Sequence, residues 1–134
     1  MIKKETISGK RKTSIAKAQI QKGEGVILIN GKRHDLLNKF HKLSIEEPIR
    51  LAKKVLGKFE YDVFVKVRGG GRESRIEAAR LAIAKVILSE TKSKELKKVF
   101  SEYDKYLLVA DTRRKEVYKP GDSKARAKRQ SSKR

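Results

Sequence analysis

Residues 61–87, YDVFVKVRGGGRESRIEAARLAIAKVI, decide the fold of this 134-residue chain. In the first seven residues Tyr61, Val63, Val65 and Val67 alternate with Asp, Phe and Lys, which is typical of a strand with one face on a core. Three glycines, residues 69–71, then end the strand. The spacing of apolar residues beyond them predicts a helix capped by Ser74. Its expected buried stripe is Ile76, Ala79, Ile83, Val86 and Ile87.

Two further strands are predicted upstream. Residues 15–20 alternate small or apolar residues with polar ones, and residues 26–29 form a short β-branched run suited to a covered strand. The segment 22–25 turns the chain between them, and Asn30-Gly31 is a strong turn signal. Residues 2–9 begin the same sheet with a weaker pattern. We expect a strand bend or loop over residues 8–13, because Gly9 precedes three cations.

Two more helices complete the predicted elements. Ser44 is the expected cap of a helix that Gly57 ends, with Glu46 and Glu47 in its first turn and Pro48 early enough to be tolerated. A shorter helix from about residue 93 places Leu96, Val99, Phe100 and Tyr103 on its apolar side. Residues 106–110 are predicted to be a last strand or an extended segment.

Together these elements predict an α+β fold, an α/β two-layer sandwich. We expect a mixed sheet of about four strands with helices packed on one face. Pro120-Gly121 marks the expected end of the domain, so the prediction is a globular domain over residues 1–118 and an extended basic arm over residues 119–134.

Positive charge is the main clue to function. The chain carries a net charge of +20, with a pI near 10.3. Residues 123–134 hold six cations, no acid and no large apolar side chain. A solubilising tail explains such a run taken alone, but residues 1–110 also hold twenty-six cations against thirteen acids. A surface of this kind favours a phosphate polymer as partner. No basic amphipathic helix suited to a membrane surface is present in the tail.

Several function classes are disfavoured. The absence of cysteine excludes disulfides and thiol catalysis. We expect a cytoplasmic protein, because the start has no apolar signal region and no run is long enough to span a membrane. His34 and His41 are too few for a metal site and are predicted to face the surface or RNA. Adjacent Glu46 and Glu47 point apart on a helix, so they form no acid/base pair. We expect no enzyme, cofactor, metal or small-molecule substrate.

The glycine run 69–71 has three competing interpretations. It can be a turn that requires positive φ angles, an RNA phosphate site formed with Arg68, Arg72 and Arg75, or an ATP loop of a small-molecule kinase. The run lacks the Gly-Lys-Ser/Thr ending of a P-loop and the spaced third glycine of a dinucleotide fingerprint. The RNA phosphate interpretation is favoured.

Four aromatic residues are candidates for stacking on bases: Phe40, Tyr103, Tyr106 and Tyr118. They are not interleaved with cations, and Tyr103 lies on an apolar helical stripe where core packing is expected. Recognition of RNA backbone and shape by lysines and arginines is therefore favoured over base reading by a sheet surface.

Several stretches resemble the universal small-subunit ribosomal protein nine family over nearly the whole chain, with a lean towards its archaeal members. They are residues 8–16 (SGKRKTSIA), 29–32 (INGK), 69–87, 111–116 (DTRRKE) and the tail 124–134. Arg75 is a departure, because the family has glutamine there. The resemblance implies a fold similar to the second domain of ribosomal protein five. It also implies a ribosome-associated place in the subunit head, on the 3′ major domain of its rRNA and beside neighbouring head proteins.

The resemblance further implies that the arm reaches the anticodon stem-loop of the peptidyl-site tRNA. The residues expected near that tRNA are Lys128, Arg129, Gln130, Ser131, Ser132, Lys133 and Arg134. The residues expected to bind rRNA are Gly9, Lys10, Arg11, Lys12, Arg68, Gly69, Gly70, Gly71, Arg72, Arg75, Arg113, Arg114, Lys115, Lys124 and Arg126. A free RNA- or DNA-binding protein, an RNA chaperone and a small kinase are the alternatives.

Overall fold

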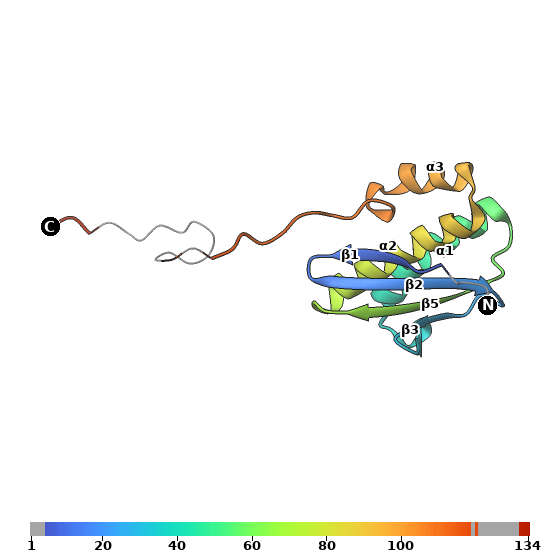
Figure 1. Ribbon diagram of the computed structural model, residues 1–134, viewed down its shortest axis with the longest axis horizontal. Helices are drawn as coiled ribbons and strands as arrows, with labels where there is room; N and C mark the ends of the chain where they lie inside the picture. Colours follow the sequence, from blue (N-terminus) through green and yellow to red (C-terminus); the bar gives the residue numbers. More distant parts are fainter. Residues whose placement is uncertain (1–4, 119, 121–131) are drawn as a thin grey trace.

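A computed structural model describes residues 5–118, 120 and 132–134. Over these residues, five strands form one mixed sheet in the order β1-β2-β5-β3-β4 (Figure 1). Their bounds are β1 Ile7–Arg11, β2 Ser14–Lys22, β3 Ile27–Ile29, β4 Lys32–Arg33 and β5 Tyr61–Arg68. β3 runs parallel to β5, and the other neighbours are antiparallel. The α+β prediction is confirmed, with the two-residue β4 as an additional edge strand.

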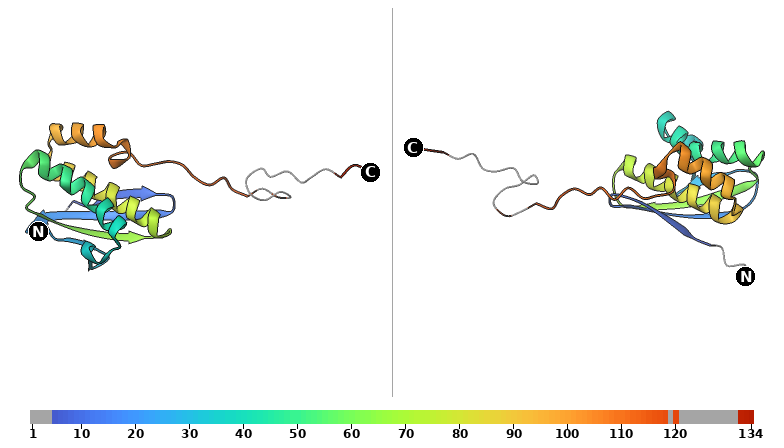
Figure 2. Two further views of the ribbon diagram at one scale, coloured as in Figure 1. Left: turned by 180° about the vertical axis from the view of Figure 1, so that it is seen from behind. Right: turned by 90° about the horizontal axis from the view of Figure 1, so that it is seen from above.

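The helices lie on one side of the sheet. They are α1 (Lys39–Leu56), α2 (Arg72–Thr91) and α3 (Lys94–Tyr103), with short 3₁₀ turns η1 (His34–Leu36) and η2 (Lys105–Leu107). α1 and α2 cover one face of the sheet, and α3 packs on the outer side of this layer (Figures 1 and 2). None of the described helices covers the opposite face of the sheet, which we call the open face (Figures 1 and 2).

Small residues let the sheet and α2 approach closely. Four alanines of α2, Ala78, Ala79, Ala82 and Ala84, are fully buried. Gly9 on β1 packs on the same helix, and a Cβ at Gly9 would lie 2.5 Å from the carbonyl oxygen of Ala78. Only glycine therefore fits at this position without moving the strand. The predicted inward face of β5 is also confirmed, because Val63, Val65 and Val67 are buried.

The start of α1 differs from the prediction. The helix begins at Lys39, and the Asn38 side chain accepts a hydrogen bond of 2.9 Å from the His41 backbone N–H. Ser44 lies inside the helix, where its hydroxyl donates to the Phe40 carbonyl oxygen at 3.1 Å. The apolar residues of this first part, Phe40 and Leu43, are exposed, so the buried stripe that predicted the helix begins only at Ile45. Glu46, Glu47 and Pro48 therefore lie within the helix instead of in its first turn.

Other local predictions were also wrong. The cap of α2 is Gly71 instead of Ser74, whose hydroxyl donates to the Gly71 carbonyl oxygen at 3.1 Å. The bend expected over residues 8–13 is strand as far as Arg11. Residues 106–110, predicted to be a last strand or an extended segment, contain the end of the 3₁₀ turn η2, with Leu108 in the αR region, and form no strand. Tyr103 is 54% exposed because α3 buries only Leu96 and Phe100, and the chain leaves the helix directly after Tyr103.

After η2 the described chain contains no further helix or strand up to residue 118; it passes the turn between β1 and β2 and then runs away from the domain (Figure 1). The predicted arm from residue 119 follows it, and most of that arm lies outside the described residues. Among the helices that are described, none is long and apolar enough to cross a membrane.

Candidate nucleic-acid interface

Three segments that are far apart in sequence meet at one end of the domain. Lys12 and Thr13 connect β1 to β2, and Ser14 at the start of β2 donates a hydrogen bond of 2.9 Å to the Gly69 carbonyl oxygen. Lys12 and Thr13 also line a shallow groove together with Arg113, Arg114 and Lys115. We call this region the basic end and define it by Lys10, Arg11, Lys12, Arg68, Arg72, Arg75, Arg113, Arg114 and Lys115. The basic end thus contains all nine cations of the folded part that were predicted to bind rRNA.

The glycine loop has a structural explanation at two of its three positions. Gly69 and Gly70 adopt φ angles of +75° and +68°, which disfavour any other residue. A Cβ at Gly70 would also collide with the hydroxyls of Ser14 and Ser74, which are hydrogen-bonded to each other at 2.8 Å and buried. Gly71 differs, because its φ is −89° and a Cβ there would meet open space. The turn interpretation is therefore confirmed for Gly69 and Gly70, and the phosphate-binding interpretation of the loop stays a prediction.

Arg11 has internal partners. Its side chain is only 14% exposed and forms ion pairs with Glu77 on α2 and with Asp111, the latter at 2.8 Å between Nη1 and Oδ2. Asp111 also accepts bonds from the side chain and the backbone N–H of Arg113. These bonds, with the charge of Arg11, lower the pKa of Asp111 from 3.8 to about 2, and the same pairing raises the pKa of Arg113. Arg11 therefore holds residues 111–113 against the domain.

Most other cations of the basic end have fewer partners within the protein than Arg11 and are more exposed to solvent. Lys10, Lys12, Arg68, Arg72 and Arg114 are exposed, and none of these five forms an ion pair within the described part of the chain. The Arg75 side chain is also exposed and donates a 3.0 Å bond to the Gly69 carbonyl oxygen, across the glycine loop. Lys115 donates to the Tyr118 hydroxyl at 2.6 Å and lies 4.4 Å from that ring's centroid. Such a cluster can neutralise several phosphates at once.

Some predicted site residues lie elsewhere. Gly9 is buried beneath α2, and its packing role gives no support to the predicted rRNA contact. Ser132, Lys133 and Arg134 are exposed and belong to no helix or strand. The other predicted arm residues lie outside the described ranges: Lys124, Arg126, Lys128, Arg129, Gln130 and Ser131.

The two histidines are not the surface residues that we predicted. Their side chains are 13% and 12% exposed and contact carboxylates: His34 lies 3.3 Å from Glu46, and His41 lies 2.7 Å from Glu73. These contacts could not be predicted from the sequence, because the partner carboxylates, Glu46 and Glu73, belong to other elements than the histidines that they contact. Both histidines therefore connect η1, α1 and α2 within the domain.

His34, Asp35 and Glu46 lie close enough to share a metal ion. However, Lys42 and Arg50 already bind these carboxylates. The bond from Lys42 lowers the pKa of Asp35. Burial alone would raise the pKa of Glu46, but bonds from Arg50 and His34 leave it below its ordinary value. The negative charge is neutralised within the protein, so this cluster does not favour a cation.

Sequence reasoning missed the open face of the sheet. Lys17 on β2 and Lys66 on β5 both point to this face and are exposed, with Phe64 beside them. Strand alternation placed Lys66 on the outward side, but only the pairing register reveals that Lys17 lies directly opposite it.

A small α+β domain that carries a basic end, followed by a basic arm, is the architecture of a protein that binds polyanions. The comparisons with known proteins agree with this class. Residues 9–134 match the family model described as ribosomal protein S9/S16. The chain is also 46% identical over 127 residues to the small ribosomal subunit protein uS9 of Methanococcus vannielii, covering 92% of this chain and 93% of that protein.

A second relative, the protein of the same name from Thermoplasma volcanium, is 43% identical over 127 residues, which covers 93% of this chain and 94% of the relative. The chain belongs to the ribosomal protein S9/S16 family. It is therefore a structural, ribosome-associated protein of the small subunit in a family that is not enzymatic, and the predicted resemblance is confirmed.

Proposed function

We propose that this protein binds rRNA in the head of the small subunit through its basic end, and that its arm reaches the tRNA in the peptidyl site. The observation that carries the proposal is the cluster of exposed cations at the same end from which the chain leaves the domain. A folded rRNA accumulates phosphate repulsion where its helices meet, and such a cluster relieves it.

The contacts at the basic end are expected to be mainly with the RNA backbone. Arginine and lysine bind phosphate oxygens without reading bases, so they position the protein on a folded RNA. Arg72 and Arg75 stand at the start of α2, which has no side-chain cap, so backbone N–H groups there add to the attraction for an anion. Arg75 replaces the glutamine that the family resemblance implies, and a phosphate partner suits that change.

The expected rRNA lies in the 3′ major domain, with other proteins of the subunit head as neighbours. These finer assignments, together with the cytoplasmic location and the tRNA contact, are part of the proposal; the family resemblance and the charge of the chain support them. The arm has cations interspersed with Ala125, Ala127, Ser131 and Ser132, and small spacers of this kind suit passage between crowded RNA helices.

Sedimentation of the full chain with ribosomes tests the first part. At high magnesium the protein is expected in the small-subunit fraction of a sucrose gradient. Recovery only in the free fraction, together with general binding to RNA or DNA, would instead indicate a free nucleic-acid-binding protein.

Truncation tests the arm. Deletion of residues 128–134 is expected to leave assembly into subunits largely intact and to weaken peptidyl-site tRNA binding. A control arm of unchanged length, with glutamine at Lys128, Arg129, Lys133 and Arg134, separates the loss of charge from the loss of length. Unchanged tRNA affinity and salt dependence in the truncated subunits would refute the arm's proposed role.

A further inference from the structure

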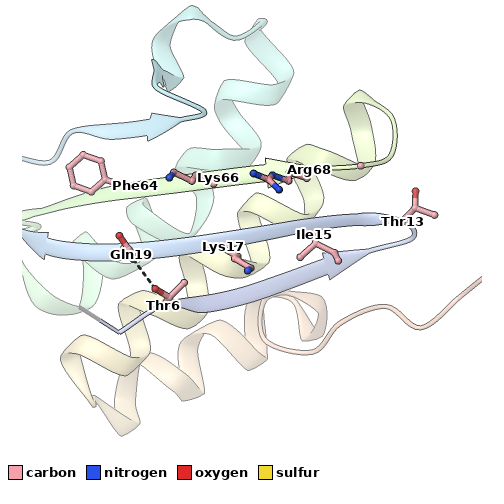
Figure 3. Close-up of a pocket in the computed structure, with 9 residues that line it drawn as sticks. Thr6, Thr13, Ile15, Lys17, Gln19, Phe64, Lys66 and Arg68 are labelled. Carbon is pink, nitrogen blue, oxygen red and sulfur yellow. Dashed lines mark hydrogen bonds between the residues drawn. The ribbon is translucent and has the colours of Figure 1, made fainter. Parts of the chain in front are cut away.

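The open face of the sheet places like charges directly opposite each other. In the antiparallel pairing of β2 with β5, Lys17 lies opposite Lys66, and the next pair towards the basic end is Ile15 with Arg68. Figure 3 looks onto this face, with the helices behind the sheet and these side chains along the two central strands. Lys10 on β1 lies opposite Ile15 on its other side, so a fourth cation adjoins the same patch.

This arrangement is unfavourable in the free protein. Like charges directly opposite in an antiparallel pair destabilise a sheet. In the part of the chain that the structure describes, Lys10, Lys17, Lys66 and Arg68 form no ion pair. Asp62 lies further along β5, but its Oδ1 already accepts hydrogen bonds from the backbone N–H groups of residues 24–26. The positive charge of the face is therefore uncompensated.

The face also offers apolar surface between these cations. Ile15 is 42% exposed, and Phe64 is partly exposed opposite Gln19. Together with Thr6, Thr13 and Lys17, these residues line a broad open groove, and no described acid is among its lining residues. An open groove of this kind presents groups for phosphates beside groups for riboses or bases.

We propose that this open face is a second RNA-binding surface of the domain, with Lys17, Lys66 and Arg68 on phosphates and with Ile15 and Phe64 against riboses or bases. The proposal rests on the proposed function, since the RNA is taken to be the rRNA of the small subunit. Two observations select RNA as the occupant. A second copy would place lysines against lysines, and the face is continuous with the basic end through Arg68 and Gly69.

Lys17→Glu tests the proposal because it is expected to weaken the binding of rRNA without lowering the stability of the free protein. In the free protein it creates an opposite-charge pair with Lys66, so the Tm is expected to stay the same or rise. Binding to a full-length small-subunit rRNA transcript is expected to weaken about tenfold, the order of magnitude of one lost charged contact. The slope of log K against log salt should become shallower by about 1.

Lys97→Glu is the matched control, because it changes the net charge equally at an exposed position on α3, a helix that lies on the side of the sheet opposite to the open face. It should retain nearly the wild-type affinity. Lys66→Glu repeats the test from the other strand, and circular dichroism verifies that each variant is folded. Equal weakening by Lys17→Glu and Lys97→Glu would overturn the second surface while leaving the proposed function intact.

Two other outcomes are informative. If the wild-type chain does not prefer the rRNA transcript to an unrelated RNA of equal length, the proposed function itself fails, and this inference fails with it. If Lys17→Glu binds rRNA normally but does not enter reconstituted subunits, the face contacts a neighbouring protein, which overturns the RNA assignment.

Discussion

Arg11 on β1 and Asp111 beyond η2 form an ion pair of 2.8 Å that fastens the outgoing chain to the edge of the sheet. Arg11 also binds Glu77 on α2, so one guanidinium connects three segments. Both side chains of the Arg11–Asp111 pair are largely covered, with exposures of 14% and 10%, which limits its screening by solvent. The direction in which the C-terminal segment leaves the domain is thereby fixed by two residues.

Arg11→Ala is expected to release this segment. Without the guanidinium, residues 111–115 lose their attachment to β1, so trypsin should cleave after Arg113, Arg114 and Lys115 several-fold faster than in the wild type. Lys10→Ala is the control, since the neighbouring side chain points to the other face of the sheet. Cleavage at the wild-type rate would show that the ion pair does not hold the segment.

The attachment is expected to weaken in strong acid. The pKa of Asp111 is lowered from 3.8 to about 2, so its contribution is complete above pH 3.8 and is lost as the pH falls through about 2. Hydrogen exchange at the Arg113 amide, which donates to Asp111 Oδ1, should report the loss. Asp111→Asn should abolish this pH step. A carboxyl titration of Asp111 near its ordinary value, followed by NMR, would contradict the prediction.

Gly70→Ala and Gly71→Ala are expected to differ sharply. At Gly70 the methyl group meets the hydroxyls of Ser14 and Ser74 and the φ is +68°, so we expect a loss of about 2–4 kcal/mol in the free energy of unfolding. At Gly71 the backbone is extended and the space is open, so alanine should change stability by at most about 1 kcal/mol, in either direction. Urea denaturation measures both. Similar losses at the two positions would mean that the loop is not held as described.

Arg72→Gln is expected to weaken rRNA binding without affecting stability. The side chain is exposed at the basic end and has no ion-pair partner among the residues described. Loss of one phosphate contact should reduce the salt slope of binding by about 0.9. The control is Arg50→Gln on α1, which removes the same charge from a residue already paired with Glu46. A salt slope for Arg72→Gln equal to that of the control would exclude Arg72 from the interface.

Local patterns in the sequence were sufficient for the central elements. Alternation predicted the inward valines of β5, and apolar spacing predicted the buried stripe of α2, because one periodicity governs each element. The Asn30-Gly31 turn between β3 and β4 was also predicted. The positive charge and the resemblance of several motifs were sufficient to predict the family to which the chain belongs.

Features that depend on distant partners could not be predicted in this way. The start of α1 depends on Asn38, whose side chain caps the helix by accepting a hydrogen bond from the His41 backbone N–H. The roles of Arg11 and His34 depend on Asp111 and Glu46, which folding brings close. The clustering of cations on the open face could not be predicted without the strand register, which places Lys17 opposite Lys66.

The attachment by Arg11 also has a kinetic consequence. A chain segment that is fixed at one end can reach only positions within its extended length, about 3.3 Å per residue. Under the proposed function, once the domain has bound rRNA, binding of the tRNA by the arm is an intramolecular step with an effective concentration that can reach the millimolar range. Because Asp111 is fixed beside the basic end, the arm then starts from the proposed RNA surface. Loss of the Arg11–Asp111 ion pair would therefore lower the local concentration of the arm without removing any of its cations.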